Sequence, residues 1–287
     1  MINGIINVYK EAGFTSFDVV AKLRGITKIR KIGHTGTLDP DATGVLPVCI
    51  GSATKLCDML TDKTKEYEAT FRLGITTDTQ DISGKVLTEE KVDITKKELE
   101  KCILSFVGRQ QQIPPMYSAI KINGQKLYDL ARAGKEVERK PRAIEISEII
   151  IVDIACADDV CTEAVIRVKC SKGTYIRTLC HDIGQKLGCG ATMTKLIRTR
   201  SGQFTIEEAL TLSQIEEIFH GENADEKINE NSSHISANKT QTAKNEIYKT
   251  TIMLKEDAIN TNLYEECCKI LSHQVNLSID SLTFIED

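Results

Sequence analysis

The chain has 287 residues, of which 41% are hydrophobic and 27% are charged, as in an ordinary globular protein. This length suffices for one large domain or two smaller ones. No apolar run reaches the length of a membrane-spanning helix, and the start MINGIINVYKEAGF lacks a basic leader followed by a hydrophobic core. We therefore expect a cytoplasmic protein without contact to a membrane.

The net charge of −4 is unevenly distributed along the chain. Residues 221–287 contain 6 basic and 12 acidic residues, which leaves 31 basic and 29 acidic residues in the part before them. The first part thus has a net charge of +2, so the acidic pI of 5.9 does not argue against an RNA partner for it.

The ten cysteines are scattered, and no Cys-x-x-Cys motif occurs. We expect small buried thiols, which agrees with a cytoplasmic location. Cys180, His181 and Cys189 could surround a zinc ion, but a second pair of ligands is missing from the sequence, and we expect no metal.

The first predicted element is a short helix over residues 16–25, with Ser16 as its N-cap and Gly25 at its end. Three basic residues follow it, Lys28, Arg30 and Lys31. Such a cluster is either a solvated surface or a binding site for phosphate groups, and the sequence favours the two interpretations equally.

Residues 33–51, GHTGTLDPDATGVLPVCIG, form the most unusual stretch of the chain. The glycines and threonines of its first half predict a loop, because they neither continue a helix nor pair well as a strand. Residues 45–50 are an apolar run typical of a buried strand, in which Pro47 predicts an edge or a bulge. Asp39 precedes a proline, which holds its backbone in an extended conformation. We expect the loop to present the Asp39 carboxylate outward in a fixed direction.

Hydrophobic periodicity and turn residues predict the elements that follow. They are a helix after Ser52, a strand over 66–73 with Tyr67 on its apolar face, a polar loop over 76–84, a helix from a capping box at Thr95 to Gly108, a hairpin at Asn123 and Gly124, strands near 149–154 and 163–170, and a helix over 176–187 closed by Gly188. Arg177 lies off the apolar stripe of the last helix, in a first turn that favours anions. An arginine so placed is usually solvated.

The familiar motifs of phosphate-binding loops, zinc proteases and catalytic triads are missing from the sequence. Residues 39–43, DPDAT, match the Asp-x-Asp-x-Thr pattern that resembles the nucleophile motif of haloacid-dehalogenase-type phosphotransferases, which would require magnesium. That motif should follow a buried hydrophobic strand, and residues 31–38 are not such a strand. The phosphotransferase interpretation is thus the weaker of two enzyme hypotheses.

The other hypothesis is based on four motifs: residues 33–51, PPMYSAIKINGQKLYDLARAG (114–134), CSKGTYIRTLCHDIGQKLGCGA (170–191) and LIRTRSG (196–202). In this order they closely resemble the TruB family, bacterial tRNA pseudouridine synthases that act on uridine 55 of the T-arm. The resemblance covers roughly residues 3–216. It implies an α+β pseudouridine-synthase fold, with a mixed, mostly antiparallel central sheet flanked by helices and a short C-terminal extension.

The resemblance also implies the roles of individual residues. Asp39 takes the place of the catalytic aspartate, and Arg177 that of the arginine that pairs with it. Tyr67 matches the tyrosine that packs on the target base, and His34 the histidine that helps to hold the T-loop with its base extruded. Leu196 matches a leucine that lines the pocket.

Further residues are candidates for contact with the substrate. Asp81 fits a position near the base. Weaker candidates for contacts with RNA phosphates are Lys10, Lys28, Arg30, Lys31, Lys172, Arg198 and Arg200.

Conversion of uridine to pseudouridine breaks the N1–C1′ bond, turns the base and joins C5 to C1′. The reaction involves no redox change, so we expect no cofactor. A single ionised carboxylate would either attack the sugar or remove its 2′ proton, and the sequence leaves both routes open. We expect a monomer whose partner is the T-arm stem-loop of tRNA. A non-catalytic RNA-folding or RNA-binding protein is the third hypothesis.

The same resemblance suggests three parts of the chain. They are a catalytic domain over 1–216, a flexible polar linker over 217–246, and a C-terminal segment over 247–287 that corresponds to a truncated or degenerate RNA-binding (PUA-like) region. The linker prediction depends on a low apolar content and on many Glu, Asn, Ser and Lys residues.

Overall fold

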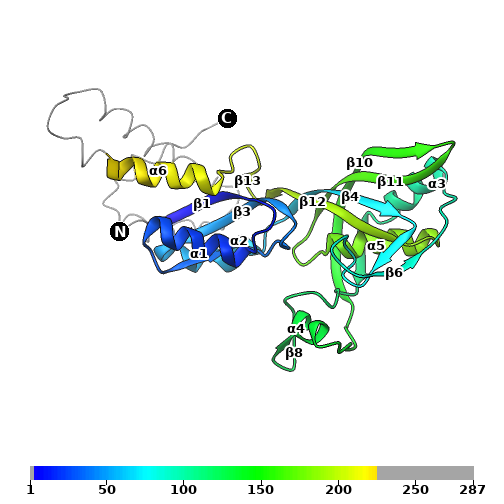
Figure 1. Cartoon of the computed structure of the whole chain (residues 1–287), viewed down its shortest axis with the longest axis horizontal. Coiled ribbons are helices and arrows are strands. Elements are labelled where there is room, and N and C mark those ends of the chain that lie inside the picture. The colour runs from blue at the N-terminus through cyan, green and yellow to red at the C-terminus, as the bar shows by residue number, and fades with distance from the viewer. Residues whose placement is uncertain (1–2, 225–287) are drawn as a thin grey trace. The chain divides into compact units, whose positions relative to one another are not determined.

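The computed structural model describes residues 3–224, which form two compact units (Figure 1). The first unit combines residues 3–62 with residues 200–224, and the second unit is Lys63–Thr199. Both contain helices and antiparallel strands, as expected for an α+β protein. No helix among the described residues is long and apolar enough to cross a membrane.

The first unit is built on two long strands. Strand β1 (Gly4–Lys10) pairs antiparallel with β3 (Thr43–Ile50) along its whole length, and the short β2 (Ile32–His34) pairs with the other edge of β3. The remaining elements are α1 (Ser16–Thr27), a 3-10 helix η1 (Gly51–Leu56), α2 (Cys57–Thr61), β13 (Phe204–Thr205) and α6 (Leu212–Ala224).

Strand β3 is buried on both faces, which explains its continuous apolar run. Leu46, Val48 and Ile50 belong to one hydrophobic cluster with residues of α1 and α6, whereas Val45 and Cys49 belong to a second cluster with residues of η1 and α2. The buried strand predicted over 45–50 is confirmed.

The prediction that Pro47 marks an edge or a bulge is wrong. The register of β3 with β1 passes through Pro47 without interruption, and β3 has strands on both edges. The Pro47 carbonyl accepts a hydrogen bond from Thr35 N (3.1 Å). In an antiparallel strand the nitrogen and carbonyl of one residue face the same edge. The nitrogen of Pro47 therefore faces the same edge as its carbonyl, which is the edge that pairs with β2. Strand β2 ends at His34, opposite Val48, so the missing N–H of Pro47 removes no hydrogen bond between β2 and β3.

Helix α1 begins one residue earlier than predicted and ends later. Its N-cap is Thr15, which forms a capping box with Asp18, and its end is at Lys28 in the left-handed conformation (φ 57°). Thr15 and Ser16 are equally good caps by residue type, but only Thr15 has an acidic residue three positions on. Ser52 is likewise no N-cap, because η1 begins at Gly51 and the backbone N–H of Ser52 donates to Asn3 Oδ1 (2.8 Å).

The second unit contains the strand order β12-β4-β11-β10-β7. These strands are β12 (Ala191–Ser201), β4 (Lys65–Leu73), β11 (Val160–Cys170), β10 (Arg142–Ala157) and β7 (Gly108–Gln112). Its helices are α3 (Lys96–Leu104), α4 (Leu127–Arg132) and α5 (Ile176–Leu187), and two small hairpins pair β5 (Ile75–Thr77) with β6 (Val86–Glu89) and β8 (Lys121–Ile122) with β9 (Gln125–Lys126).

Most local predictions for the second unit are confirmed. Helix α3 opens with the capping box of Thr95 and Glu98, and Gly188 closes α5 in the left-handed conformation. Asn123 and Gly124 both have positive φ angles (50° and 82°), as the two central residues of a type I′ hairpin turn require. The strand predicted near 149–154 is much longer, because β10 starts at Arg142 and continues into a hairpin with β11.

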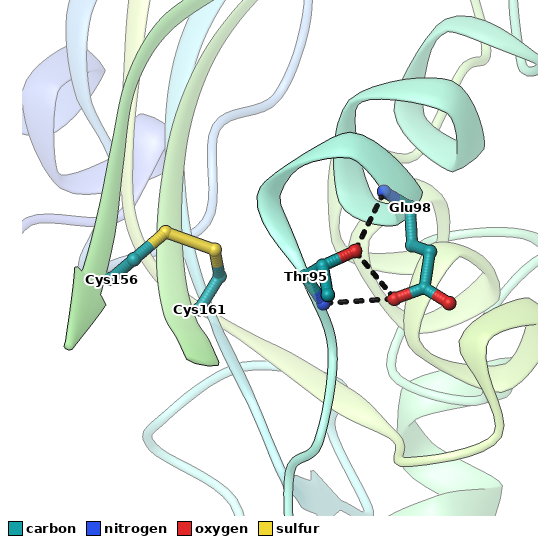
Figure 2. The surroundings of a disulfide bond; sticks show 4 residues. All are labelled: Thr95, Glu98, Cys156 and Cys161. Carbon is teal, nitrogen blue, oxygen red and sulfur yellow. Dashed lines mark hydrogen bonds between the residues drawn. A yellow bond between two sulfur atoms is a disulfide. The ribbon is translucent and has the colours of Figure 1, made fainter. Parts of the chain in front are cut away.

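The prediction of buried thiols holds for five described cysteines but is wrong for one pair. Cys156 and Cys161 form a disulfide between the ends of β10 and β11 (Figure 2). A two-residue turn at Asp158 and Asp159, both with positive φ (48° and 65°), places the two cysteines opposite each other in register. The sequence gives little sign of this, because an Asp-Asp pair is an uncommon turn of this kind.

The predicted boundary at residue 216 falls within α6, which runs to Ala224. Residues 225–246 of the predicted linker and the segment 247–287 lie outside the described residues.

Candidate active site

The predicted site residues divide between the two units. His34 and Asp39 belong to the first unit, whereas Tyr67, Asp81, Arg177 and Leu196 belong to the second. Each group is described within its own unit.

The loop that carries Asp39 is fixed on both sides of this residue. The hydroxyl of Ser16 in α1 accepts a hydrogen bond from Leu38 N (2.9 Å) and donates one to Leu38 O (3.3 Å). On the other side, Gly13 N donates to Pro40 O (3.0 Å), and Ala42 N closes a turn to Asp39 O (3.1 Å). The half-buried Asp39 thus extends from a backbone that is held at several points.

Lys10 stabilises the same loop through hydrogen bonds from its side chain. Its side chain is fully buried, and its Nζ donates to the carbonyl oxygens of Pro40 (2.9 Å), Ala42 (2.5 Å) and Glu11 (3.1 Å). A buried ammonium group needs such partners to offset its loss of water. This position does not fit the predicted phosphate contact, and Lys10 is instead part of the framework of the Asp39 loop. The sequence signal was a single charged residue at the end of an otherwise uncharged strand, GIINVYK.

His34 is the last residue of β2 and is half-buried. Its Nδ1 accepts a hydrogen bond from Gly36 N (3.4 Å). His34 therefore stands where β2 passes into the loop of Asp39.

In the second unit the structure brings Arg177 and Asp81 together. Arg177, in the first turn of α5, is 4% exposed, and its Nη1 lies 3.3 Å from Asp81 Oδ2. The guanidinium also donates to Thr79 O (2.8 Å) and Tyr117 O (2.8 Å). Arg177 is thus not a solvated arginine, because a carboxylate and two carbonyl oxygens replace its water.

The loop around Asp81 is itself well ordered by hydrogen bonds. Asp81 Oδ1 accepts from Thr79 Oγ1 (2.7 Å), Ser83 N (3.1 Å) and Ser83 Oγ (2.5 Å). Ile82 N donates to Met193 O (2.8 Å), which ties the loop to β12. One carboxylate oxygen of Asp81 therefore accepts hydrogen bonds within its own loop, and the other lies against the guanidinium of Arg177.

Tyr67 and Leu196 lie on strands of the second unit. Tyr67 is half-buried on β4 opposite Val168 and on the same face as the buried Ala69 and Phe71. Leu196 lies on β12 and is 7% exposed. The structure thus places both residues on strands of the central sheet.

The seven predicted phosphate contacts have different surroundings. Five of them are exposed, as a contact with RNA requires: Lys28, Arg30, Lys31, Lys172 and Arg200. Arg198 is 1% exposed and, like Lys10, is buried too deeply to be a surface contact in this structure.

The zinc hypothesis gains no support, since among residues 3–224 no group of three His, Cys, Asp or Glu side chains is arranged to bind a metal ion. Cys180 is fully buried, and burial lowers the pKa of His181. Burial also raises the pKa of the neighbouring Asp182 to about 6.

The raised pKa of Asp182 predicts a measurable effect on stability. Between about pH 4 and pH 6 the unfolded state loses this proton while the native state keeps it, so the free energy of unfolding falls as pH rises and stays lower above pH 6. Asp182→Asn should stabilise the protein above pH 6 by about 1 kcal/mol, since solvent reaches part of the side chain. Urea unfolding of the variant and the wild type at pH 4 and pH 8 measures the difference in their free energies of unfolding. A gain at pH 4 as large as at pH 8 would contradict it, and Asp93→Asn at an exposed position is the control.

Two family models match adjoining parts of the chain. Residues 24–176 match the N-terminal domain of the TruB family pseudouridylate synthases, and residues 177–236 match the tRNA pseudouridylate synthase B C-terminal domain. A tRNA pseudouridine synthase B from Lachnoclostridium phytofermentans is 57% identical over 219 residues, which cover 75% of this chain and 71% of that protein. A tRNA pseudouridine synthase B from Clostridium novyi is 55% identical over 214 residues, or 75% and 72% of the two chains.

Solved structures show the same fold. A chain in a crystal structure of a Cbf5-Nop10-Gar1 complex is 32% identical with a TM-score of 0.62, over 78% of this chain and 56% of that one. A chain in an archaeal box H/ACA sRNP Nop10-Cbf5 complex is 30% identical with a TM-score of 0.58, again over 78% and 56%. This protein thus spans little more than half the length of those chains. Its fold is the predicted pseudouridine-synthase fold, and with a family model that matches more than half of its residues, the chain belongs to the TruB family of pseudouridylate synthases.

Proposed function

We propose that this protein isomerises uridine 55 in the T-arm of tRNA to pseudouridine, with Asp39 as its catalytic carboxylate. The observation that carries the proposal is the loop of residues 38–42, whose backbone is fixed by Ser16, Gly13 and Lys10, so that Asp39 extends from a rigid support. A carboxylate on a rigid support needs little reorganisation when it meets a reacting atom. The similarity to proteins named tRNA pseudouridine synthase B supports tRNA as the substrate.

The reaction requires that the uridine leave its stack, which costs a few kcal/mol. An aromatic side chain that packs on the extruded base offsets about 1–3 kcal/mol of this cost. We assign that role to Tyr67 and assign Leu196 to the wall of the base pocket. His34 would help to hold the T-loop with its base extruded.

Arg177 would supply the positive charge that keeps the carboxylate of Asp39 ionised during the reaction. Its two carbonyl partners and Asp81 hold the guanidinium in one orientation. The exposed residues Lys28, Arg30, Lys31, Lys172 and Arg200 would contact phosphates, so RNA binding should weaken as salt is raised. We further propose that the protein acts as a cytoplasmic monomer and needs no cofactor.

Release of tritium from 5-tritiated uridine tests the proposed function. A T-arm stem-loop labelled only at position 55 should lose its tritium, because the C5–H bond is broken when C5 joins C1′. A stem-loop labelled elsewhere in the T-arm is the control and should keep its tritium. Release from the control at an equal rate would refute the specificity, and no release from either would favour the RNA-binding hypothesis.

The same assay, carried out in excess EDTA, distinguishes the isomerase hypothesis from the phosphotransferase hypothesis. Asp39 follows the irregular residues 35–38 instead of a strand, which differs from the arrangement that this hypothesis needs. Full turnover in excess EDTA is expected, whereas a strict magnesium requirement together with phosphoryl transfer would support the alternative.

Asp81 should act as a positioning residue for Arg177. Asp81→Asn removes the charge 3.3 Å from Arg177 Nη1 while the amide retains most of the shape of the side chain. We expect kcat to fall by about 10–100-fold with little change in KM, because the guanidinium loses its orientation in the reacting complex. Asp78→Asn is the matched control, since Asp78 lies in the same loop, is exposed and accepts from Lys85 N (2.8 Å). Equal losses in the two variants would contradict the assignment.

A further inference from the structure

The Cys156–Cys161 disulfide closes the end of the β10–β11 hairpin. Only the pair Ala157 and Val160 and the two turn residues lie beyond it. The hairpin thus holds the two sulfur atoms together whether they are bonded or not, because the register places the cysteines opposite each other. A dithiol in this position is prearranged to form the bond again.

The two cysteines differ strongly in their exposure to solvent. Cys161 is fully buried, and its N–H donates to Ile94 O (2.9 Å) just before the first turn of α3. Cys156 is exposed, since it lies on the outer strand β10, which pairs with β7 only over residues 142–146. Of the two cysteines, Cys156 is therefore the one that is open to a reagent from solution.

Cys156 is also distinct from the other cysteines that the structure describes. Cys49, Cys102, Cys170, Cys180 and Cys189 are buried, and Cys57 is half-buried. Within residues 3–224, Cys156 is the one exposed cysteine. Access to solvent is a requirement for thiol–disulfide exchange, so the structure separates this site from the six free thiols.

The hairpin around the disulfide is acidic. Residues 153–163, DIACADDVCTE, contain Asp153, Asp158, Asp159 and Glu163 and no basic residue. The adjoining residues 93–98, DITKKE, contain two acidic and two basic residues and leave this balance unchanged. Such a local field repels anionic reagents and attracts cationic ones at low ionic strength.

We propose that Cys156 and Cys161 form a reversible thiol–disulfide couple. Exchange begins at Cys156, and the couple reacts preferentially with cationic small-molecule disulfides. In the forward direction the Cys156 thiolate attacks a disulfide RSSR, which forms a Cys156–SR bond and releases RS⁻. The Cys161 thiolate then attacks Sγ of Cys156, which forms the Cys156–Cys161 bond and releases a second RS⁻. Two protein thiols are oxidised, and one RSSR is reduced to two thiols. Reduction by RS⁻ follows the same steps backwards and begins with attack on Sγ of Cys156.

Peptide mass mapping of the reduced full-length protein after treatment with cystamine tests the order of attack. The wild type should give the 156–161 disulfide, whereas Cys161→Ala should accumulate a stable mixed disulfide at position 156. In Cys156→Ser, modification at position 161 should be at least about tenfold slower, because the thiol is buried. Equal modification of Cys161 in Cys156→Ser, or a wild type that keeps both thiols free in excess cystamine, would overturn the proposal. The far-ultraviolet circular dichroism of each variant shows whether it has folded.

The charge preference is tested separately with cystamine and the anionic glutathione disulfide. At low salt we expect cystamine to oxidise the pair about tenfold faster, with the ratio falling towards one in 1 M salt. The double variant Asp158→Asn, Asp159→Asn should lower the ratio in the same way, and asparagine tolerates the positive φ angles of this turn. A ratio unaffected by both salt and these substitutions would refute the charge preference. Neither experiment depends on the isomerase activity proposed above.

Discussion

Asp39→Asn is expected to abolish conversion of uridine 55 while the affinity for a T-arm stem-loop stays nearly unchanged. Asparagine has the shape of aspartate but can neither attack C1′ as an anion nor remove the 2′ proton. Loss of the carboxylate should lower the single-turnover rate by at least about 10²–10⁴-fold, the usual contribution of a positioned acid–base group. The loop should remain intact, because its described anchors involve the backbone of Leu38, Pro40 and Ala42.

Asp41→Asn is the matched control for this experiment. Asp41 lies in the same turn two residues on, and its side chain is exposed. Under the isomerase hypothesis this variant should retain most of its activity, whereas the phosphotransferase hypothesis requires both aspartates. Tritium release and filter binding of the same stem-loop measure the two properties. An Asp39→Asn protein with wild-type turnover would refute the mechanism, and an equal loss in Asp41→Asn would show that the turn itself, and not the carboxylate, had been damaged.

The sequence predicted those parts of the fold that depend on local patterns. The Thr95–Glu98 capping box, the Asn123–Gly124 turn and the alternation along β4 each involve residues within a few positions of one another, and all three are confirmed. The end of α1 was placed too early, because a glycine within a helix costs only about 1 kcal/mol and tertiary packing overrides it.

The predictions that failed for Lys10 and Arg177 concern contacts between distant parts of the chain. Nothing near Lys10 in sequence shows that its ammonium group meets the carbonyl of Pro40, 30 positions away. The pairing of Arg177 with Asp81 likewise joins a helix to a loop almost a hundred residues earlier, and the sequence alone favoured a solvated arginine there. The motifs that resemble the TruB family identified these residues as important, but their partners within each unit came from the structure.

Gly184→Ala should be among the most destabilising single substitutions in the second unit. A Cβ atom at this position would lie 2.1 Å from Ala191 N and 2.3 Å from the carbonyl carbon of Gly190. These are backbone atoms at the start of β12, so they cannot turn aside as the end of a side chain can. Helix α5 would have to move away from β12, at a cost of about 3 kcal/mol or more in the free energy of unfolding. Since Arg177 lies on the same helix, activity should fall as well.

Gly25→Ala separates this steric effect from the general effect of alanine in a helix. Gly25 lies within α1, and a Cβ atom there would meet nothing within 4 Å. Alanine should therefore stabilise α1 by up to about 1 kcal/mol through its higher helix propensity and leave activity unchanged. The two substitutions are chemically identical and both lie in helices, so opposite signs in urea unfolding can arise only from the close approach of α5 to β12. If Gly184→Ala were as harmless as Gly25→Ala, then α5 would be free to shift, and the fixed orientation inferred for Arg177 would lose its support.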